Sequence, residues 1–130
     1  MTGYLLDTHV LQWWSSEPSR LSPIAASSIS SADELGVAAI TWVELAWLAH
    51  RDRLRHALPV RSWLRGLSEQ VRTLSITPEI ADIAASLPRS FPADPADRLI
   101  YATAVEHGWK LVTRDERLRA YNGPGDLTVW

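Results

Sequence analysis

The sequence contains no cysteine in its 130 residues. Disulfide bonds, thiolate nucleophiles and zinc sites with cysteine ligands are therefore excluded. An excess of positive charge is also missing, because 13 lysines and arginines are set against 15 acidic residues and the formal net charge is −2. Without a global basic field, any surface that binds a nucleic acid has to be local.

Long hydrophobic runs are absent as well. No segment is long and apolar enough to span a bilayer, and the first residues, MTGYLLDTHV, lack the basic start and apolar stretch of a signal peptide. We therefore expect a cytoplasmic protein that does not enter a membrane. The G-x-G-x-x-G, Walker A, G-x-S-x-G and H-E-x-x-H motifs are also missing, so the nucleotide-binding, serine hydrolase and zinc protease classes that carry them are not indicated.

What the sequence does contain is a regular alternation of strand-like and helical segments. Strands are predicted at residues 3–6, 35–38, 71–75, 110–113 and 127–130. Helices are predicted at residues 8–14, 22–32, 40–50, 59–67, 78–85 and in a longer run that ends near 107. This alternation predicts an α/β fold around a largely parallel sheet of four or five strands. Because there is no repeat and no break in composition, residues 1–130 are expected to form a single domain.

Two acidic residues directly follow predicted strands. Asp7 comes after the strand GYLL, and Asp115 follows the strand KLVT with only Arg114 between them. In a parallel sheet the carboxyl ends of all strands lie along one edge, where ligands bind. Two carboxylates from separate strands are therefore expected to meet at this edge.

Two further acids lie on predicted helices. Glu44 interrupts the apolar run AAITWVELAWLA, and its nearest helical cation, Arg51, is two turns away. A lone buried carboxylate at this position would be costly without a partner. Asp97 falls in the first turn of the helix DPADRLIYATAVEHG, on the stripe of Ile100 and Tyr101 that is expected to face the sheet.

Each acid taken alone also has a purely structural explanation. Asp7 and Asp115 can be helix N-caps, and Asp94 is a good N-cap because Pro95 follows at the preferred first helical position. Asp97 can complement the helix dipole. Taken together these explanations weaken, because crowded carboxylates raise one another's pKa values unless a cation neutralises them. Oxygen ligands without cysteine suit a hard divalent cation, Mg²⁺ or Mn²⁺, which can activate water for phosphodiester hydrolysis.

Four motifs in order carry a resemblance to a known family. They are LLDTHVLQWW, TWVELAWLA, DPADRLIYATA and KLVTRDERL, and they span residues 4 to about 119. The chain resembles a PIN-domain ribonuclease, specifically the toxin of a VapBC-type toxin–antitoxin pair. The resemblance implies a three-layer α/β/α sandwich. It places the family's acidic quartet, as catalytic and metal-binding residues, on Asp7, Glu44, Asp97 and Asp115.

The resemblance also implies a function and partners. They are a Mg²⁺- or Mn²⁺-dependent endoribonuclease, inhibition by a small VapB-like antitoxin, and a toxin homodimer. Thr113, Asp94 and Thr8 take accessory places beside the quartet. Arg98 and Arg114, each next to an acid in the sequence, are interpreted as contacts to RNA phosphate.

The seven tryptophans give a further set of expectations. Trp42, Trp47 and Trp109 are expected in the core. Adjacent Trp13 and Trp14 point about 100° apart on a helix, so one of them is expected near the surface at a partner interface. Trp63, between two arginines, is the better candidate for stacking on a base, but a residue at the rim that covers the core is the favoured explanation of it.

Other readings of an acidic sheet edge are weighed against this one. A haloacid-dehalogenase-type phosphatase needs a second Asp where this chain has His9, and a receiver domain needs a lysine after its last strand, whereas the sole lysine, Lys110, starts a strand. Two alternatives stay open. One is a PIN-fold binding module without catalysis, and the other is a PIN-type nuclease that acts on DNA.

Overall fold

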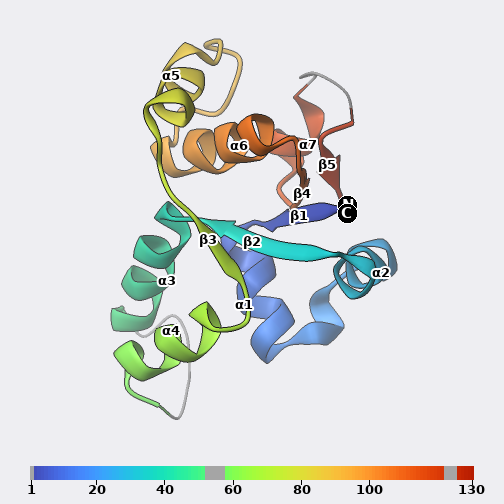
Figure 1. The fold of residues 1–130 in the computed structure, drawn as a ribbon, viewed down its shortest axis with the longest axis vertical. Coiled ribbons are helices and arrows are strands. Elements are labelled where there is room, and N and C mark those ends of the chain that lie inside the picture. The colour runs from blue at the N-terminus through green and yellow to red at the C-terminus, as the bar shows by residue number, and fades with distance from the viewer. Residues whose placement is uncertain (1, 52–57, 122–125) are drawn as a thin grey trace.

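The computed structural model of the chain describes residues 2–51, 58–121 and 126–130. In these parts the strands are β1 (Gly3–Leu6), β2 (Glu34–Ala38), β3 (Arg72–Leu74), β4 (Lys110–Val112) and β5 (Thr128–Val129). The helices are α1 (Thr8–Ser16), the 3₁₀ turn η1 (Pro18–Arg20), α2 (Pro23–Ser31), α3 (Ile40–His50), α4 (Val60–Ser68), α5 (Pro78–Ser86), α6 (Pro95–His107) and α7 (Glu116–Ala120) (Figure 1).

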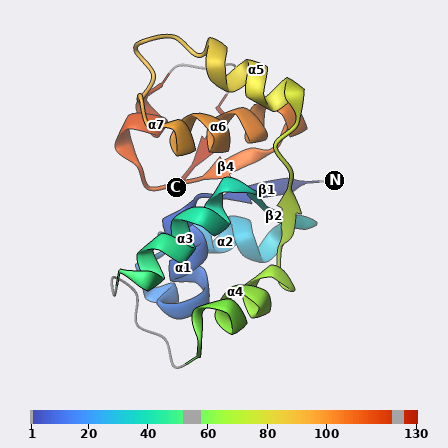
Figure 2. The same ribbon diagram turned by 90° about the vertical axis from the view of Figure 1, so that its left-hand side faces the viewer.

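The strands form one five-stranded sheet in the order β3-β2-β1-β4-β5, and every pair is parallel. Figure 2 shows α1, α2, α3 and α4 on one side of this sheet and α5, α6 and α7 on the other. The predicted three-layer α/β/α sandwich with a parallel sheet is therefore confirmed. No helix in residues 2–51, 58–121 and 126–130 has the length and apolarity needed to cross a membrane.

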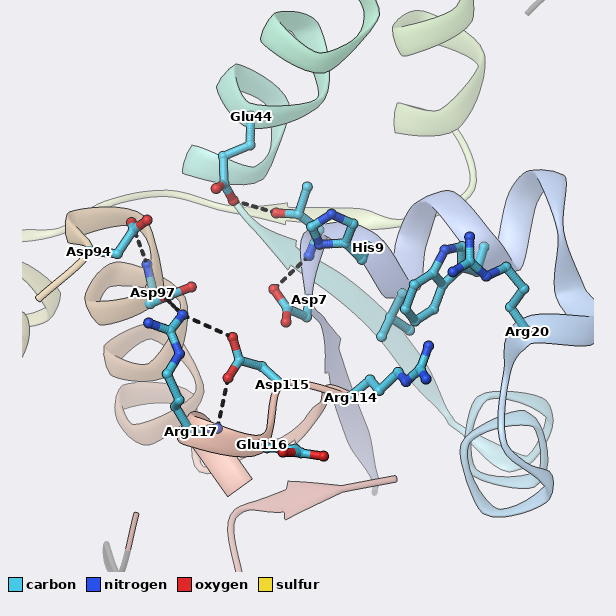
Figure 3. A pocket seen from close by; sticks show the side chains of 13 residues that line it. Asp7, His9, Arg20, Glu44, Asp94, Asp97, Arg114, Asp115, Glu116 and Arg117 are labelled. Carbon is cyan, nitrogen blue, oxygen red and sulfur yellow. Dashed lines mark hydrogen bonds and ion pairs between the residues drawn. The ribbon is translucent and has the colours of Figure 1, made fainter. Parts of the chain in front are cut away.

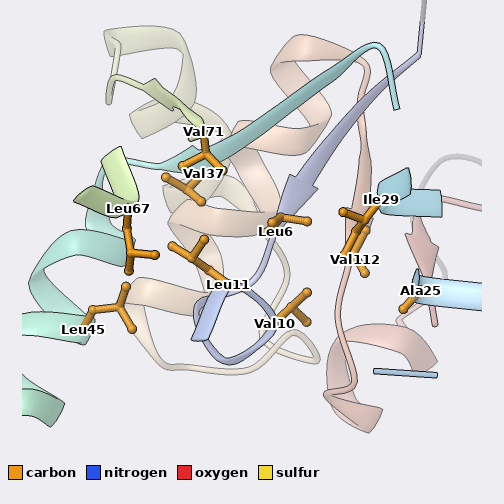
Figure 4. Packing of buried hydrophobic residues seen from close by; sticks show 10 residues of the cluster. All are labelled: Leu6, Val10, Leu11, Ala25, Ile29, Val37, Leu45, Leu67, Val71 and Val112. Carbon is orange, nitrogen blue, oxygen red and sulfur yellow. The ribbon is translucent and has the colours of Figure 1, made fainter. Parts of the chain in front are cut away.

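Successive residues of each strand face opposite layers, which is why the inner strands β1, β2 and β4 end in unbroken apolar runs. Leu6 is in register with Val112, and both pack in the cluster beneath α1 to α4 that Figure 4 shows. Leu5 is in register with Leu111, and both pack in the cluster under α6 and α7. Ile100 of α6 is fully buried there, as its stripe predicts.

The strand order creates the crevice in which a site can form. From β1 the chain builds outward to β2 and β3 on one side and to β4 and β5 on the other. Loops at the carboxyl ends of β1 and β4 therefore lead to helices on opposite faces of the sheet, and ligands bind at such a switch point. The backbone N–H of Asp7 donates to the Val112 carbonyl at 3.0 Å and so holds the end of β1 against β4.

The side chain of Trp109 packs closely against the backbone of β1 and β2. Trp109 precedes β4 and lies across Gly3 and Gly36, so that a Cβ added at either glycine would fall 2.2 Å or 2.7 Å from the indole. Gly108, just before it, takes the left-handed φ of 65° that ends α6. Both features tie the end of α6 to the sheet.

The tryptophan expectations are met in part. Trp13 is 7% exposed and Trp14 is partly buried, while Trp42 and Trp109 pack against the two clusters from partly buried positions. The prediction that Trp47 is core is wrong, since its side chain is 59% exposed. Because α3 is apolar on all sides, its sequence does not indicate which face lies against the sheet.

Candidate active site

Asp7 lies at the start of the site, where β1 hands over to α1. Its Oδ1 accepts the backbone N–H of Thr8 at 2.8 Å, which makes it the N-cap of α1. Its Oδ2 accepts the Thr113 hydroxyl at 2.6 Å. The side chain is only 9% exposed, and the two hydrogen bonds fix its orientation. The Asp7 carboxylate therefore both caps α1 and belongs to the candidate site.

Glu44 is held by a chain of threonine hydroxyls. The Thr8 hydroxyl donates to Glu44 Oε1 at 2.6 Å, and the Thr8 and Thr41 hydroxyl oxygens are 3.2 Å apart. Since a hydroxyl has one proton and that of Thr8 goes to Glu44, Thr41 donates to Thr8. Both threonines are buried. The partner that Glu44 needs on its apolar helix is thus a neutral hydroxyl.

The acids of α6 lie across the pocket from Glu44. Asp94 is the N-cap of α6, because its Oδ1 accepts the backbone N–H groups of Ala96 at 2.8 Å and Asp97 at 3.4 Å. Asp97 follows in the first turn, and its side chain is 15% exposed. Asp94 therefore sets the start of the helix, and Asp97 points into the pocket from it (Figure 3).

Asp115 completes the group from the opposite loop. Its Oδ1 caps α7 by accepting the backbone N–H groups of Arg117 at 2.8 Å and Leu118 at 3.3 Å. Its own backbone N–H donates to the Thr113 hydroxyl oxygen at 3.0 Å. One hydroxyl thus joins Asp7 to the Asp115 loop, although Asp7 and Thr113 are 106 residues apart in sequence.

These side chains line one cavity of about 620 Å³. Its walls come from the junction of β1 and α1, from α1, η1, α3 and α6, and from the loop after β4 with the start of α7, and Figure 3 shows the side chains converging from these elements. The lining residues are Asp7, Thr8, His9, Val10, Trp13, Arg20, Glu44, Asp94, Asp97, Arg114, Asp115, Glu116 and Arg117. The structure therefore brings together all four acids of the predicted quartet, and Thr113 lies beneath them as the partner of Asp7.

Crowding of the acids changes their protonation. Burial, reinforced by the charges of Asp94, Asp7 and Asp115, raises the pKa of Asp97 to about 7. Burial also raises the pKa of Asp7, against the hydrogen bond from Thr113, and raises the pKa of Glu44, against the hydrogen bond from Thr8. The pocket therefore holds carboxyl groups that take up protons unless a cation is present.

Asp115 behaves in the opposite way. Burial opposes its ionisation, but hydrogen bonds from the side chain and backbone of Arg117 and the backbone of Leu118 outweigh this and lower the pKa of Asp115. The Arg117 Nη2 lies 3.3 Å from Asp115 Oδ2 and 3.4 Å from Asp97 Oδ2. One guanidinium thus bridges two carboxylates that come from different elements.

The donor set fits a hard divalent cation. The four carboxylates of the quartet line the cavity, and a guanidinium already stands as the shared counter-ion of Asp97 and Asp115. In the described parts of the chain no three acidic or histidine side chains are grouped closely enough to form a ready metal site. With Arg117 bridging two of the acids, a metal ion would have to draw the carboxylates together and displace this side chain.

Comparison with known proteins places this pocket in a family. Residues 4–124 match the PIN domain. The chain belongs to the PIN-domain family. Ribonuclease VapC22 of Mycobacterium tuberculosis (strain ATCC 25618 / H37Rv) is 62% identical to it over 130 residues, which cover 100% of both chains. The predicted resemblance is thereby confirmed.

Solved structures agree with this PIN fold. The chain is similar to one from a toxin–antitoxin complex of Klebsiella pneumoniae, with a TM-score of 0.72, 22% identity and coverage of 98% of this chain and 96% of the other. It is also similar to a chain of DNA-bound VapBC from Salmonella typhimurium, with a TM-score of 0.73, 19% identity and coverage of 99% and 98%. At these identities the similarity concerns the PIN fold itself.

One predicted contact residue has a different role in this PIN domain. Arg98 does not line the cavity. Its guanidinium donates to five backbone carbonyls of the segment before α6, at 3.0 to 3.4 Å, namely those of Ala84, Leu87, Pro88, Phe91 and Pro92. All five of its N–H groups are thereby used, so the prediction that Arg98 contacts RNA phosphate is corrected. Arg98 instead fastens the proline-rich loop to α6.

Several residues of the PIN pocket were not predicted. Arg117 lies two residues after Asp115, and the charged string RDER was a local signal for it. His9 had the same kind of signal, two residues after Asp7. Arg20 and Trp13 are brought in by the turn after α1, and nothing in their local sequence marks them as part of a site.

Proposed function

We propose that this chain is a divalent-metal-dependent endoribonuclease that acts as the toxin of a toxin–antitoxin pair and hydrolyses RNA phosphodiester bonds. The observation that carries the proposal is the meeting of Asp7, Glu44, Asp97 and Asp115 in one cavity of a PIN domain. The 62% identical relative that is named a ribonuclease supports it.

Asp7, Asp97 and Asp115 would hold a Mg²⁺ or Mn²⁺ ion directly or through water, and Glu44 would complete its shell or orient the nucleophile. When bound, such an ion activates water and stabilises negative charge on a phosphate oxygen. The threonines act on the carboxylates themselves. The hydroxyls of Thr113 and Thr8 donate to Asp7 and Glu44 at 2.6 Å each, so these two carboxylates have a fixed orientation before a cation draws the acids together.

Partners and location are part of the proposal. A cognate VapB-like antitoxin that inhibits the toxin is supported by similarity to chains from a toxin–antitoxin complex and from VapBC. We further propose a toxin homodimer, a single PIN domain over residues 1–130 and a cytoplasmic location. RNA is the proposed substrate, with Arg114 at the pocket as a phosphate contact.

The test uses Asp97→Asn, which keeps the size of the side chain and removes the charge. We expect RNA cleavage in Mn²⁺ to fall at least about a hundredfold, because a metal ligand is lost. A chelator should have the same effect on the wild type. The matched control is Asp82→Asn, an exposed aspartate on α5 outside the cavity, which should cleave at the wild-type rate.

The same assay separates the alternatives. Wild-type protein that binds Mn²⁺ in calorimetry but cuts only a DNA copy of the oligonucleotide would be a DNA-directed nuclease. Protein that neither cleaves RNA or DNA nor binds Mn²⁺ would be a binding module, and the proposal would be wrong. Asp97→Asn protein with undiminished cleavage would remove that residue from the chemistry.

A further inference from the structure

The cavity has a second end that the acids do not occupy. Arg20, the last residue of η1, and Arg114, in the loop between β4 and α7, both approach the ring of Trp13. The guanidinium carbons lie 4.7 Å and 5.8 Å from the ring centroid. We call these three residues the arginine end. Figure 3 shows Arg20 and Arg114 on the side of the pocket opposite Asp94 and Asp97.

The arginine end rests on a fixed base. Trp13 is only 7% exposed, and its ring packs against Trp130 and His9 at centroid distances of 6.0 Å and 5.9 Å. Guanidinium groups over an aromatic ring gain a cation–π attraction that holds them in place. The two arginines are 94 positions apart in sequence, and their meeting over one buried ring is a product of the fold.

Charge in the cavity is divided between its ends. Six carboxylates line it, those of Asp7, Glu44, Asp94, Asp97, Asp115 and Glu116. Of the three arginines in the lining, Arg117 is bound to two of these acids. Arg20 makes an exposed ion pair with Glu17 at 3.2 Å, and within the described residues the Arg114 guanidinium makes no hydrogen bond or ion pair. A polyanion approaching this cavity therefore finds available positive charge at the arginine end.

We propose that Arg20 and Arg114 clamp a phosphate of the RNA backbone next to the phosphodiester that is cut. The inference rests on the proposed ribonuclease function. A guanidinium forms paired hydrogen bonds to phosphate oxygens, and Arg20 gives up only an exposed ion pair to do so. Binding there carries the neighbouring phosphodiester toward the acids without bringing the whole polyanion against them.

The clamp contacts the phosphate backbone of the RNA and does not contact a base. Trp13 is too buried to offer a face for stacking, since it is covered by its own neighbours and flanked by both arginines. Contacts to phosphate position a nucleic acid but carry no sequence information. The clamp is thus expected to strengthen binding of all RNA sequences alike.

The experiment measures binding of a fluorescent 12-nucleotide single-stranded RNA by anisotropy, in chelator so that no cleavage occurs. Arg20→Gln and Arg114→Gln should each weaken binding roughly tenfold, because each variant lacks a charge-assisted hydrogen-bonding group. The slope of log Kd against log salt concentration should fall by about 0.7 for each phosphate that the protein no longer neutralises. A second RNA of unrelated sequence should show the same changes.

Arg72→Gln is the matched control. Arg72 is 57% exposed and pairs with Glu34, much as Arg20 is 50% exposed and pairs with Glu17, but Arg72 lies on β3 outside the cavity. It should leave both affinity and salt slope unchanged. Arg114→Lys, which keeps the charge but not the paired donors, should retain the slope and recover part of the affinity.

These experiments test the phosphate clamp and the proposed ribonuclease function separately. Wild-type affinity and slope in both glutamine variants would overturn the clamp, while cleavage of RNA by the wild type in Mn²⁺ would leave the ribonuclease intact. If Arg20→Gln lowers the melting temperature, the exposed Arg114 alone decides the result. If the wild type binds RNA but never cleaves it, the proposed ribonuclease function is wrong. The slopes of log Kd against log salt concentration still test whether Arg20 and Arg114 bind phosphate. A wild type that binds no RNA overturns the clamp as well.

Discussion

At the scale of single residues, several acids of the site also have a structural role in the fold. Asp7, Asp94 and Asp115 each cap a helix, and all three line the same cavity. Structural and functional explanations of these acids, which compete when each is considered alone, are both satisfied. Asp97 is the exception, since it caps nothing and its pKa is raised to about 7 by burial and by its acidic neighbours.

The raised pKa of Asp97 predicts how metal binding depends on pH. Below about pH 7 the ion has to displace a proton from this carboxyl, so Mn²⁺ affinity should increase about tenfold per pH unit up to that point and then level off. Calorimetry across this range in buffers of constant ionic strength measures it. A flat affinity profile through neutral pH would contradict the prediction.

The same group sets the sign of a stability change. Its pKa is raised from 3.8 in the unfolded chain to about 7 in the folded one, so the folded state binds the proton more tightly. The free energy of unfolding of the metal-free protein therefore decreases between about pH 4 and pH 7. In the control variant Asp97→Asn, the free energy of unfolding should change less between these pH values, because the asparagine side chain has no proton to lose.

Arg117 predicts a second effect on the metal. Its guanidinium must leave Asp97 and Asp115 before an ion can bind both. Each exposed ion pair contributes less than about 1 kcal/mol, so at pH 8 Arg117→Gln should bind Mn²⁺ roughly two- to fivefold more tightly. Arg119→Gln, on the same helix but outside this cavity, corrects for the lost charge alone. Equal or weaker affinity in Arg117→Gln would show that Arg117 does not compete with the ion.

The residues that were predicted and those that were not differ in how they reach the pocket. Asp7 directly follows β1 and Asp115 lies three residues after the end of β4, so the sheet carries both to the shared edge. Arg98 is adjacent to Asp97 in sequence, but neighbours on a helix point about 100° apart, and its side chain reaches the proline-rich loop instead. Arg20 depends on the path of a turn, which no local pattern specifies.

At the scale of elements, the contact of Trp109 with the sheet predicts that glycine-to-alanine substitutions in β2 and in α4 change the free energy of unfolding in opposite directions. Gly36→Ala places a Cβ 2.7 Å from the indole and should destabilise the fold by about 1–3 kcal/mol, because the ring has to move. Gly66→Ala, inside α4 with no atom within 4 Å, should stabilise by about 0.5–1 kcal/mol. Urea unfolding of both variants measures the difference.

A smaller side chain at position 109 provides the control. In the background of Trp109→Leu, Gly36→Ala should cost less, because the nearest atom that the new Cβ meets belongs to the indole and only the tight contact with the Arg72 carbonyl oxygen at 3.1 Å remains. An unchanged cost in the double variant would assign the effect of Gly36 to its backbone and not to Trp109.

Among the α-helices of the described residues, those of nine residues or more were predicted. The eleven-residue α3 and the thirteen-residue α6 have enough turns to show their boundaries, and Gly108 marks the end of α6. The five-residue α7 was not predicted, because so short a helix has no measurable period. It exists through tertiary support, since Asp115 caps it and Leu118 is fully buried.

At the scale of the whole molecule, the layers could be predicted and the strand order could not. Alternating strands and helices require a parallel sheet covered on both faces. β1, β2 and β4 all end in short buried apolar runs, so the pattern does not indicate that β1 lies between β2 and β4. That order is what places Asp7 beside the Thr113 and Asp115 loop, and it is known from the structure and not from the sequence.

The hydroxyl bond from Thr113 to Asp7 has a consequence for how the protein is made. The threonine that orients Asp7 is synthesised 106 positions after it. Until Thr113 has been made, the growing chain carries separate carboxylates and no assembled pocket. A chain that ended before Thr113 would therefore lack the bond that orients Asp7 in the pocket.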